Sequence, residues 1–71
     1  MTIYRLLKET SFDPDAVKRL ATAFEEICRS LGVPANDEPQ RERIARTVIT
    51  IAQAGERDPT RLRERALDAL K

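Results

Sequence analysis

The apolar residues of this chain recur at helical spacing, and the stretch from Arg41 to Gly55 carries them in two adjacent rows. The rows are Ile44, Val48 and Ile51, and beside them Ala45, Ile49 and Ala52. An apolar arc of this width requires neighbouring helices on two sides. The spacing therefore predicts the central helix of a small bundle, beginning near residue 39 and ending near residue 54. The narrower polar side is predicted to consist of Arg41, Arg43, Arg46, Thr47, Thr50 and Gln53.

A second amphipathic segment precedes the central one and has clear signals at both ends. Asp13 and Pro14 are typical of a helix start, because Asp accepts hydrogen bonds from free amides and Pro suits the first helical position. Gly32 is typical of a helix end. The predicted apolar stripe is Val17, Leu20, Phe24, Ile27 and Leu31, and Ala21 and Cys28 widen it. This helix presents a single face to a core.

The last segment repeats the same start signal, Asp58 followed by Pro59, after a stop at Gly55. It is predicted to form a short helix with a buried face of Leu62, Ala66, Ala69 and Leu70, and with Leu67 at the edge. The opening residues 1–12 can form two helical turns, which are too short to be stable alone. Whether this N-terminal segment packs on its own bundle or is exchanged as an arm between two subunits is left open.

Composition limits the fold to one class. The chain has 71 residues, enough for one domain, and the alternation of Val, Thr and aromatic residues that is typical of strands is missing. We expect one all-α domain spanning residues 1–71, a three-helix bundle with a short extra N-terminal helix or arm. A domain this small has a limited core. Self-association into a symmetric homodimer and a monomeric state are both left open.

Cysteine and histidine usage limits the chemistry and the compartment. A lone Cys28 excludes an internal disulfide, and no secretory or membrane-spanning apolar run is present. We therefore expect a cytoplasmic protein with no membrane association. The chain has no His, the commonest general base and metal ligand. No cofactor or metal site is expected.

The remaining reactive side chains have structural explanations. Asp13, Asp37 and Asp58 precede predicted helices and are explained as caps, although the sequence leaves open whether Asp37 or Glu38 caps the central helix. Cys28 lies at the edge of an apolar stripe, where a thiol behaves as a small hydrophobic group with a raised pKa. The sequence therefore predicts no catalytic residue, and an enzyme is the third of the function classes considered.

The C-terminal third contains the most conspicuous charge cluster. Arg57, Arg61, Arg63 and Arg65 fall within nine residues, beside a helix, turn, helix pair that resembles a DNA-reading motif. Interspersed acids nearly cancel their charge, and the whole chain has a net charge of only +1. A phosphate-binding face usually carries few acids. We therefore do not expect nucleic acid as a partner. The predicted candidate partner surface is Glu56, Arg57, Arg61 and Arg65, of which Glu56 and Arg57 are expected to be exposed.

The stretch from Ile44 to Leu70 resembles short uncharacterised proteins of rhizobia and related alphaproteobacteria. The shared pattern is an apolar helix, a Gly-Glu-Arg-Asp-Pro turn at residues 55–59, and a helix rich in Arg and Leu that ends in Ala-Leu. The Phe-Asp-Pro start at residues 12–14 is also similar. This resemblance implies a bacterial origin, but it implies no activity and transfers no functional residue.

These observations favour a small cytosolic helical module that acts in protein-protein interaction or regulation and has no catalytic activity. Its partner would be another protein or a second copy of itself. The alternative is a DNA-binding regulator similar to helix-turn-helix proteins, which would use the Arg-rich C-terminal helix.

Overall fold

The computed structural model describes residues 2–8, 10 and 12–70. These residues form four helices and no strand: α1 (Thr2–Leu7), α2 (Pro14–Leu31), α3 (Glu38–Gln53) and α4 (Pro59–Leu70). The all-α prediction is confirmed, as is the arrangement of three longer helices preceded by a short one. No described helix is both long and apolar enough to cross a lipid bilayer.

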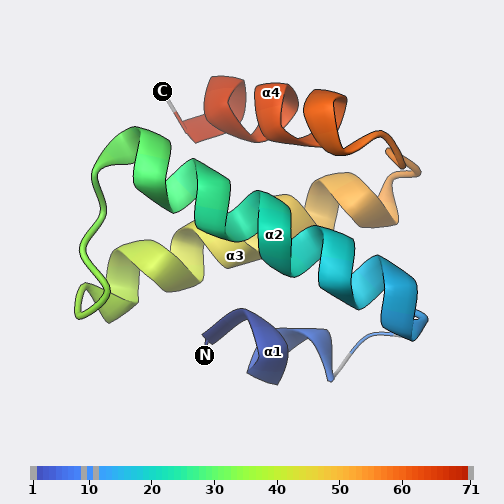
Figure 1. Ribbon diagram of the computed structural model, residues 1–71, viewed down its shortest axis with the longest axis horizontal. Coiled ribbons are helices and arrows are strands. Elements are labelled where there is room, and N and C mark those ends of the chain that lie inside the picture. Colours follow the sequence, from blue (N-terminus) through green and yellow to red (C-terminus); the bar gives the residue numbers. More distant parts are fainter. Residues whose placement is uncertain (1, 9, 11, 71) are drawn as a thin grey trace.

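The helices pack around α3. Figure 1 shows α2 in front of α3, with α1 and α4 on opposite sides of this pair. Both α1 and α4 contact α2 and α3, but within the described ranges they do not approach each other. The molecule is consequently flat, with Cα extents of 28 × 23 × 15 Å. Since α1 and α4 do not meet, the face of α3 that points away from α2 has no helix over it.

Aspartate side chains define the helix starts. Asp13 Oδ1 accepts a hydrogen bond from the Ala16 amide at 2.8 Å, and Asp37 Oδ1 accepts a longer one from the Gln40 amide at 3.4 Å. Each bond satisfies one of the amides that a helix leaves free in its first turn. The choice between Asp37 and Glu38 is thereby decided in favour of Asp37.

Glycines end the two long helices. Gly32 has φ +68°, and its neighbour Val33 donates a backbone hydrogen bond to the Cys28 carbonyl at 2.9 Å. Gly55 has φ +109° and lies one residue beyond the cap of α3, which is Ala54. Side-chain-bearing residues rarely adopt these values, so both predicted stops are confirmed.

The core joins all four helices. Its largest fully buried side chains are Phe24, Ile3, Ile27, Ile44 and Val48. Because Ile3 is among them, α1 is held by the hydrophobic core of its own chain. In this structure the described part of the N-terminal segment packs on α2 and α3.

Three burial predictions within the helices were wrong. Arg41, predicted on the polar side of α3, is only 8% exposed, because it lies one turn before Ile44 and on the same side of the helix. Leu31, predicted in the stripe of α2, is 45% exposed, since it is the last residue of the helix and extends beyond the core. Ala69, predicted to be buried, is exposed at the end of α4, where its short side chain faces a shallow groove.

Candidate functional site

The four residues predicted as a partner surface do not share one environment. Arg57 and Arg61 are exposed, as expected. The Glu56 side chain is only 11% exposed, and its Oε2 lies 4.0 Å from Arg65 Nη2. The expectation that Glu56 is a free surface charge was therefore wrong.

The side chain of Glu56 is covered by residues of other segments of the chain. Its side chain helps to line a very small cavity, about 20 Å³, together with Phe12, Leu20 and Leu62. Phe12 precedes α2, Leu20 belongs to α2, and Leu62 belongs to the first turn of α4. Glu56 and Arg65 are nine positions apart, which is not a helical pair spacing, so the sequence contained no local signal of their contact.

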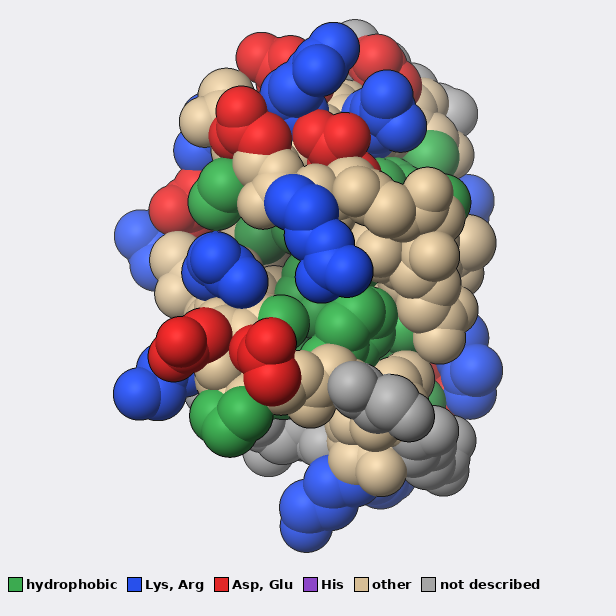
Figure 2. All heavy atoms as spheres, turned by 90° about the vertical axis from the view of Figure 1, so that its right-hand side faces the viewer, with side chains coloured by type: hydrophobic (Ala, Val, Ile, Leu, Met, Phe, Trp, Pro, Cys, Tyr) green, Lys and Arg blue, Asp and Glu red, His purple; other side chains and the backbone are tan. Residues whose placement is uncertain are grey.

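The end of the molecule that carries this corner has mixed charge. Figure 2 shows Lys and Arg side chains interspersed with Asp and Glu, around a central area of hydrophobic side chains. On α4, the exposed residues Arg61 and Arg65 alternate with the exposed acids Glu64 and Asp68. A surface of alternating sign offers no continuous positive potential to a phosphate backbone.

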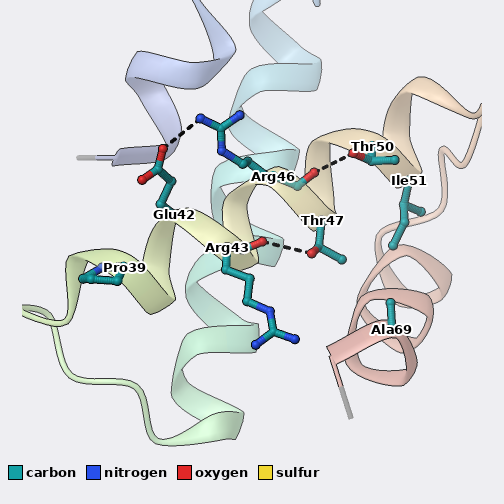
Figure 3. A pocket seen from close by; sticks show the side chains of 8 residues that line it. All are labelled: Pro39, Glu42, Arg43, Arg46, Thr47, Thr50, Ile51 and Ala69. Carbon is teal, nitrogen blue, oxygen red and sulfur yellow. Dashed lines mark hydrogen bonds and ion pairs between the residues drawn. The ribbon is translucent and has the colours of Figure 1, made fainter.

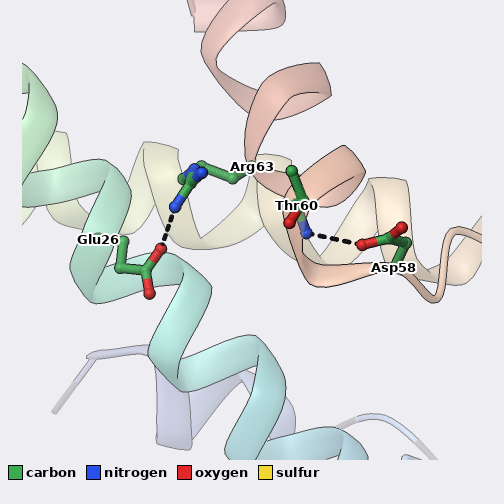
Figure 4. A network of polar contacts seen from close by, with 4 residues as sticks. All are labelled: Glu26, Asp58, Thr60 and Arg63. Atoms are coloured by element: carbon green, nitrogen blue, oxygen red, sulfur yellow. Dashed lines mark hydrogen bonds and ion pairs between the residues drawn. The ribbon is translucent and has the colours of Figure 1, made fainter.

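Arg63 is engaged within the fold and does not contribute to a free basic patch. Figure 4 shows it extending from α4 to α2, where its Nη1 donates a hydrogen bond to Glu26 Oε2. At the start of the same helix, Asp58 Oδ1 accepts a hydrogen bond from the Thr60 amide at 2.9 Å. Asp58 is thus the cap predicted from the sequence. Of the four clustered arginines, Arg63 and Arg65 have acidic partners in other elements.

A second surface lies on the uncovered face of α3, and we call it the α3 groove. It is shallow and open, with a volume of about 600 Å³. Figure 3 shows its lining: Pro39, Glu42, Arg43, Arg46, Thr47, Thr50 and Ile51 of α3, and Ala69 of α4. Most of these α3 residues were predicted to lie on the polar side of the helix. The groove itself could not be predicted from the sequence, because it depends on where α4 packs.

The floor of the α3 groove is less polar than its sequence suggests. The Thr47 hydroxyl donates to the Arg43 carbonyl at 2.9 Å, and the Thr50 hydroxyl donates to the Arg46 carbonyl at 2.8 Å. Both threonines therefore have their hydroxyls satisfied within α3. Together with Ile51 and Ala69 they form the floor of the groove. A partner that covers this floor leaves no threonine hydroxyl without a hydrogen bond.

Two guanidinium groups lie along this floor. Arg46 Nη2 is 2.8 Å from Glu42 Oε1, an ion pair within one turn of α3. Arg43 extends toward the opposite edge of the groove, as Figure 3 shows, and has no acidic partner among the described residues. The lining thus contains two cations and one anion, a small positive excess.

Two features of the described residues bear on metal binding and on thiol chemistry. No group of three or more Cys, Asp and Glu side chains among these described residues could hold a metal ion. Cys28 is buried at 2% exposure, and desolvation raises the pKa of its thiol, although Arg41 opposes this shift. A thiol of this kind is mostly protonated at neutral pH and is a poor nucleophile.

Neither a family model, nor a curated protein, nor a solved structure matches this chain. The resemblance to short alphaproteobacterial proteins stays a prediction.

Proposed function

We propose that this protein is a small interaction or regulatory module that binds another protein and performs no catalysis. The observation that carries the proposal is the uncovered face of α3. This helix contacts α1, α2 and α4, yet the two flanking helices leave its outer face open along the α3 groove. A fourth side of the central helix is available to a partner.

The chemistry of the groove suits a protein better than a small polar ligand. A floor of satisfied hydroxyls and apolar side chains can be covered at little desolvation cost. Arginines at the edge of such a floor are frequent anchors in protein interfaces, because their stems pack and their guanidinium groups bind carboxylates. Arg43 and Arg46 occupy this position.

We also propose that the protein acts in the cytoplasm without a cofactor, since its single cysteine is buried and suits a reducing compartment.

The alternative function is DNA binding through Arg61 and Arg65 of α4. The neighbouring acids Glu64 and Asp68 weigh against it, because they would face the same phosphates.

The proposal can be tested by site-specific photo-crosslinking in host cells. A photoreactive residue at Thr50 would report a partner on the α3 groove. Thr22 on α2 is a matched control, because it is also an exposed threonine whose hydroxyl bonds to the carbonyl four residues earlier. We expect one or a few discrete protein adducts from position 50 and not from position 22.

A specific adduct should also be lost when Arg43 is replaced by Glu. Circular dichroism would establish that this variant remains folded, as expected for an exposed side chain. Identical adduct patterns from positions 22 and 50, or no protein adduct from position 50, would refute the proposed function.

A further inference from the structure

We infer that the α3 groove accepts an acidic amphipathic helix of a different protein, with its apolar stripe on the groove floor and its carboxylates at the groove edges. This inference rests on the proposed function and specifies the chemistry of the partner. It follows from three features of the groove: its flanks, its floor and its charge.

The flanks favour a helix as the bound element. The groove follows the outer side of α3 from Pro39 to Ile51, with Ala69 of α4 at one flank, so an added helix can lie along α3 there. A helix satisfies its own backbone hydrogen bonds, so it can cover an apolar floor without unpaired amides. An extended peptide would need backbone partners, and the groove is lined by side chains of two helices whose interior amides are already bonded.

The floor and the charges define the face of that helix. Thr47, Thr50 and Ile51 form a strip with no unsatisfied hydroxyl, which suits an apolar stripe. Figure 3 shows Arg43 and Arg46 extending to opposite edges of this strip. Carboxylates beside the apolar stripe of a docked helix would meet these cations, as charged residues flank the seam of a coiled coil.

The same charges disfavour a second copy of this chain in the groove. A two-fold symmetric contact places the same surface of both subunits face to face. It would bring together two linings that each hold two cations, Arg43 and Arg46, and one anion, Glu42, so each copy would contribute a net positive charge to the contact. Like charges brought together in this way oppose association.

The test uses two designed helical peptides and measures amide chemical shifts of the isotope-labelled protein. Both peptides carry Leu at the a and d heptad positions; one has Glu at e and g, and the other has Lys there. We expect the Glu peptide to shift the amides of Thr47, Thr50, Ile51 and Ala69. The Lys peptide should bind at least about tenfold more weakly.

Charge reversal gives the decisive comparison. Arg43→Glu should weaken the Glu peptide about tenfold and should bind the Lys peptide more tightly than the unmodified protein does. Arg61→Glu removes the same charge from the exposed surface of α4, and it should change Glu-peptide binding by less than about threefold. Equal binding of both peptides, or equal effects of the two variants, would overturn the inference.

Two further titrations test whether nucleic acid or a second copy of this protein binds the α3 groove instead of an acidic helix. Duplex DNA of 20 base pairs at physiological salt should leave the groove amides unshifted, and so should raising the concentration of the protein alone. A groove response to either one would assign the surface to nucleic acid or to a second copy and would refute the acidic helix. If position 50 yields specific adducts in cells while the Glu peptide does not bind, the docking function stands and the acidic chemistry fails.

Discussion

Arg41 Nη2 donates a hydrogen bond to Glu25 Oε1 at 3.0 Å and joins α3 to α2 beside the core. The guanidinium carbon also lies 4.9 Å from the centroid of the Phe24 ring, within the range of a cation-π contact. Arg41 is therefore a buried arginine whose guanidinium group contacts both the Glu25 carboxylate and the Phe24 ring. Glu25, at 38% side-chain exposure, keeps access to water.

Replacing this arginine should destabilise the fold. We expect Arg41→Ala to lower the free energy of unfolding by about 2 kcal/mol, because it removes a charged hydrogen bond, the ring contact and the packing of the side-chain stem. Urea denaturation measures this loss. Arg43→Ala, on the same helix but exposed, is the control and should change stability by less than about 0.5 kcal/mol. Equal effects of the two substitutions would contradict the structural role of Arg41.

The corner between α3 and α4 makes a second comparison possible. Glu56→Ala should cost about 1 kcal/mol, because it removes a mostly covered side chain and the acidic partner of Arg65. Arg57→Ala should leave the melting temperature nearly unchanged, since Arg57 is exposed. Thermal unfolding followed by circular dichroism compares the two neighbours. A larger loss from Arg57→Ala would mean that Arg57 and not Glu56 holds the corner.

Gly55 is predicted to be required for its backbone conformation and not for space. A Cβ placed there would meet no atom within 4 Å, yet φ is +109°. Gly55→Val should therefore cost more than about 1 kcal/mol, whereas D-alanine, introduced by chemical synthesis, should be tolerated or stabilising. Chemical denaturation of the synthetic proteins distinguishes these outcomes. If D-alanine destabilises as much as L-valine, the constraint at Gly55 is steric.

Cys28 should be protected in the folded protein. Burial raises the pKa of its thiol, so the fold favours the neutral form. This stabilisation is fully present below the pKa of the unfolded thiol and is lost as pH rises through the folded-state pKa. Alkylation by iodoacetamide at pH 8 should be at least about 100-fold slower in buffer than in 8 M urea. In Cys28→Ala the alkaline loss of stability should be smaller, and a fast native reaction would contradict the buried assignment.

The alternative function, DNA binding through α4, can be tested directly. We expect no sequence-selective binding of duplex DNA at physiological salt, because Glu64 and Asp68 accompany Arg61 and Arg65 on the exposed surface of α4. Fluorescence anisotropy across a salt series measures this. Micromolar, salt-sensitive binding that disappears when Arg61 and Arg65 are both replaced by Ala would establish the alternative.

The sequence by itself determined the helices and their ends. Local chemistry specifies these features: Asp13 and Asp58 cap helices through bonds that span two or three residues, and Gly32 and Gly55 adopt backbone angles that other residues resist. The helical period also identified the core positions Ile44 and Val48. Each of these properties depends on neighbours in the chain.

Tertiary structure alone decided which charges are paired and which surface is open. Arg41 meets Glu25, Arg63 meets Glu26 and Arg65 meets Glu56 across different elements, and no residue spacing predicts such contacts. The exposure of Ala69 and the α3 groove likewise depend on where α1 and α4 lie against α3. Helix packing angles follow from the sum of many weak side-chain contacts. The sequence pattern therefore predicted that α3 has neighbouring helices on two sides, whereas only the tertiary structure shows which side of α3 stays open.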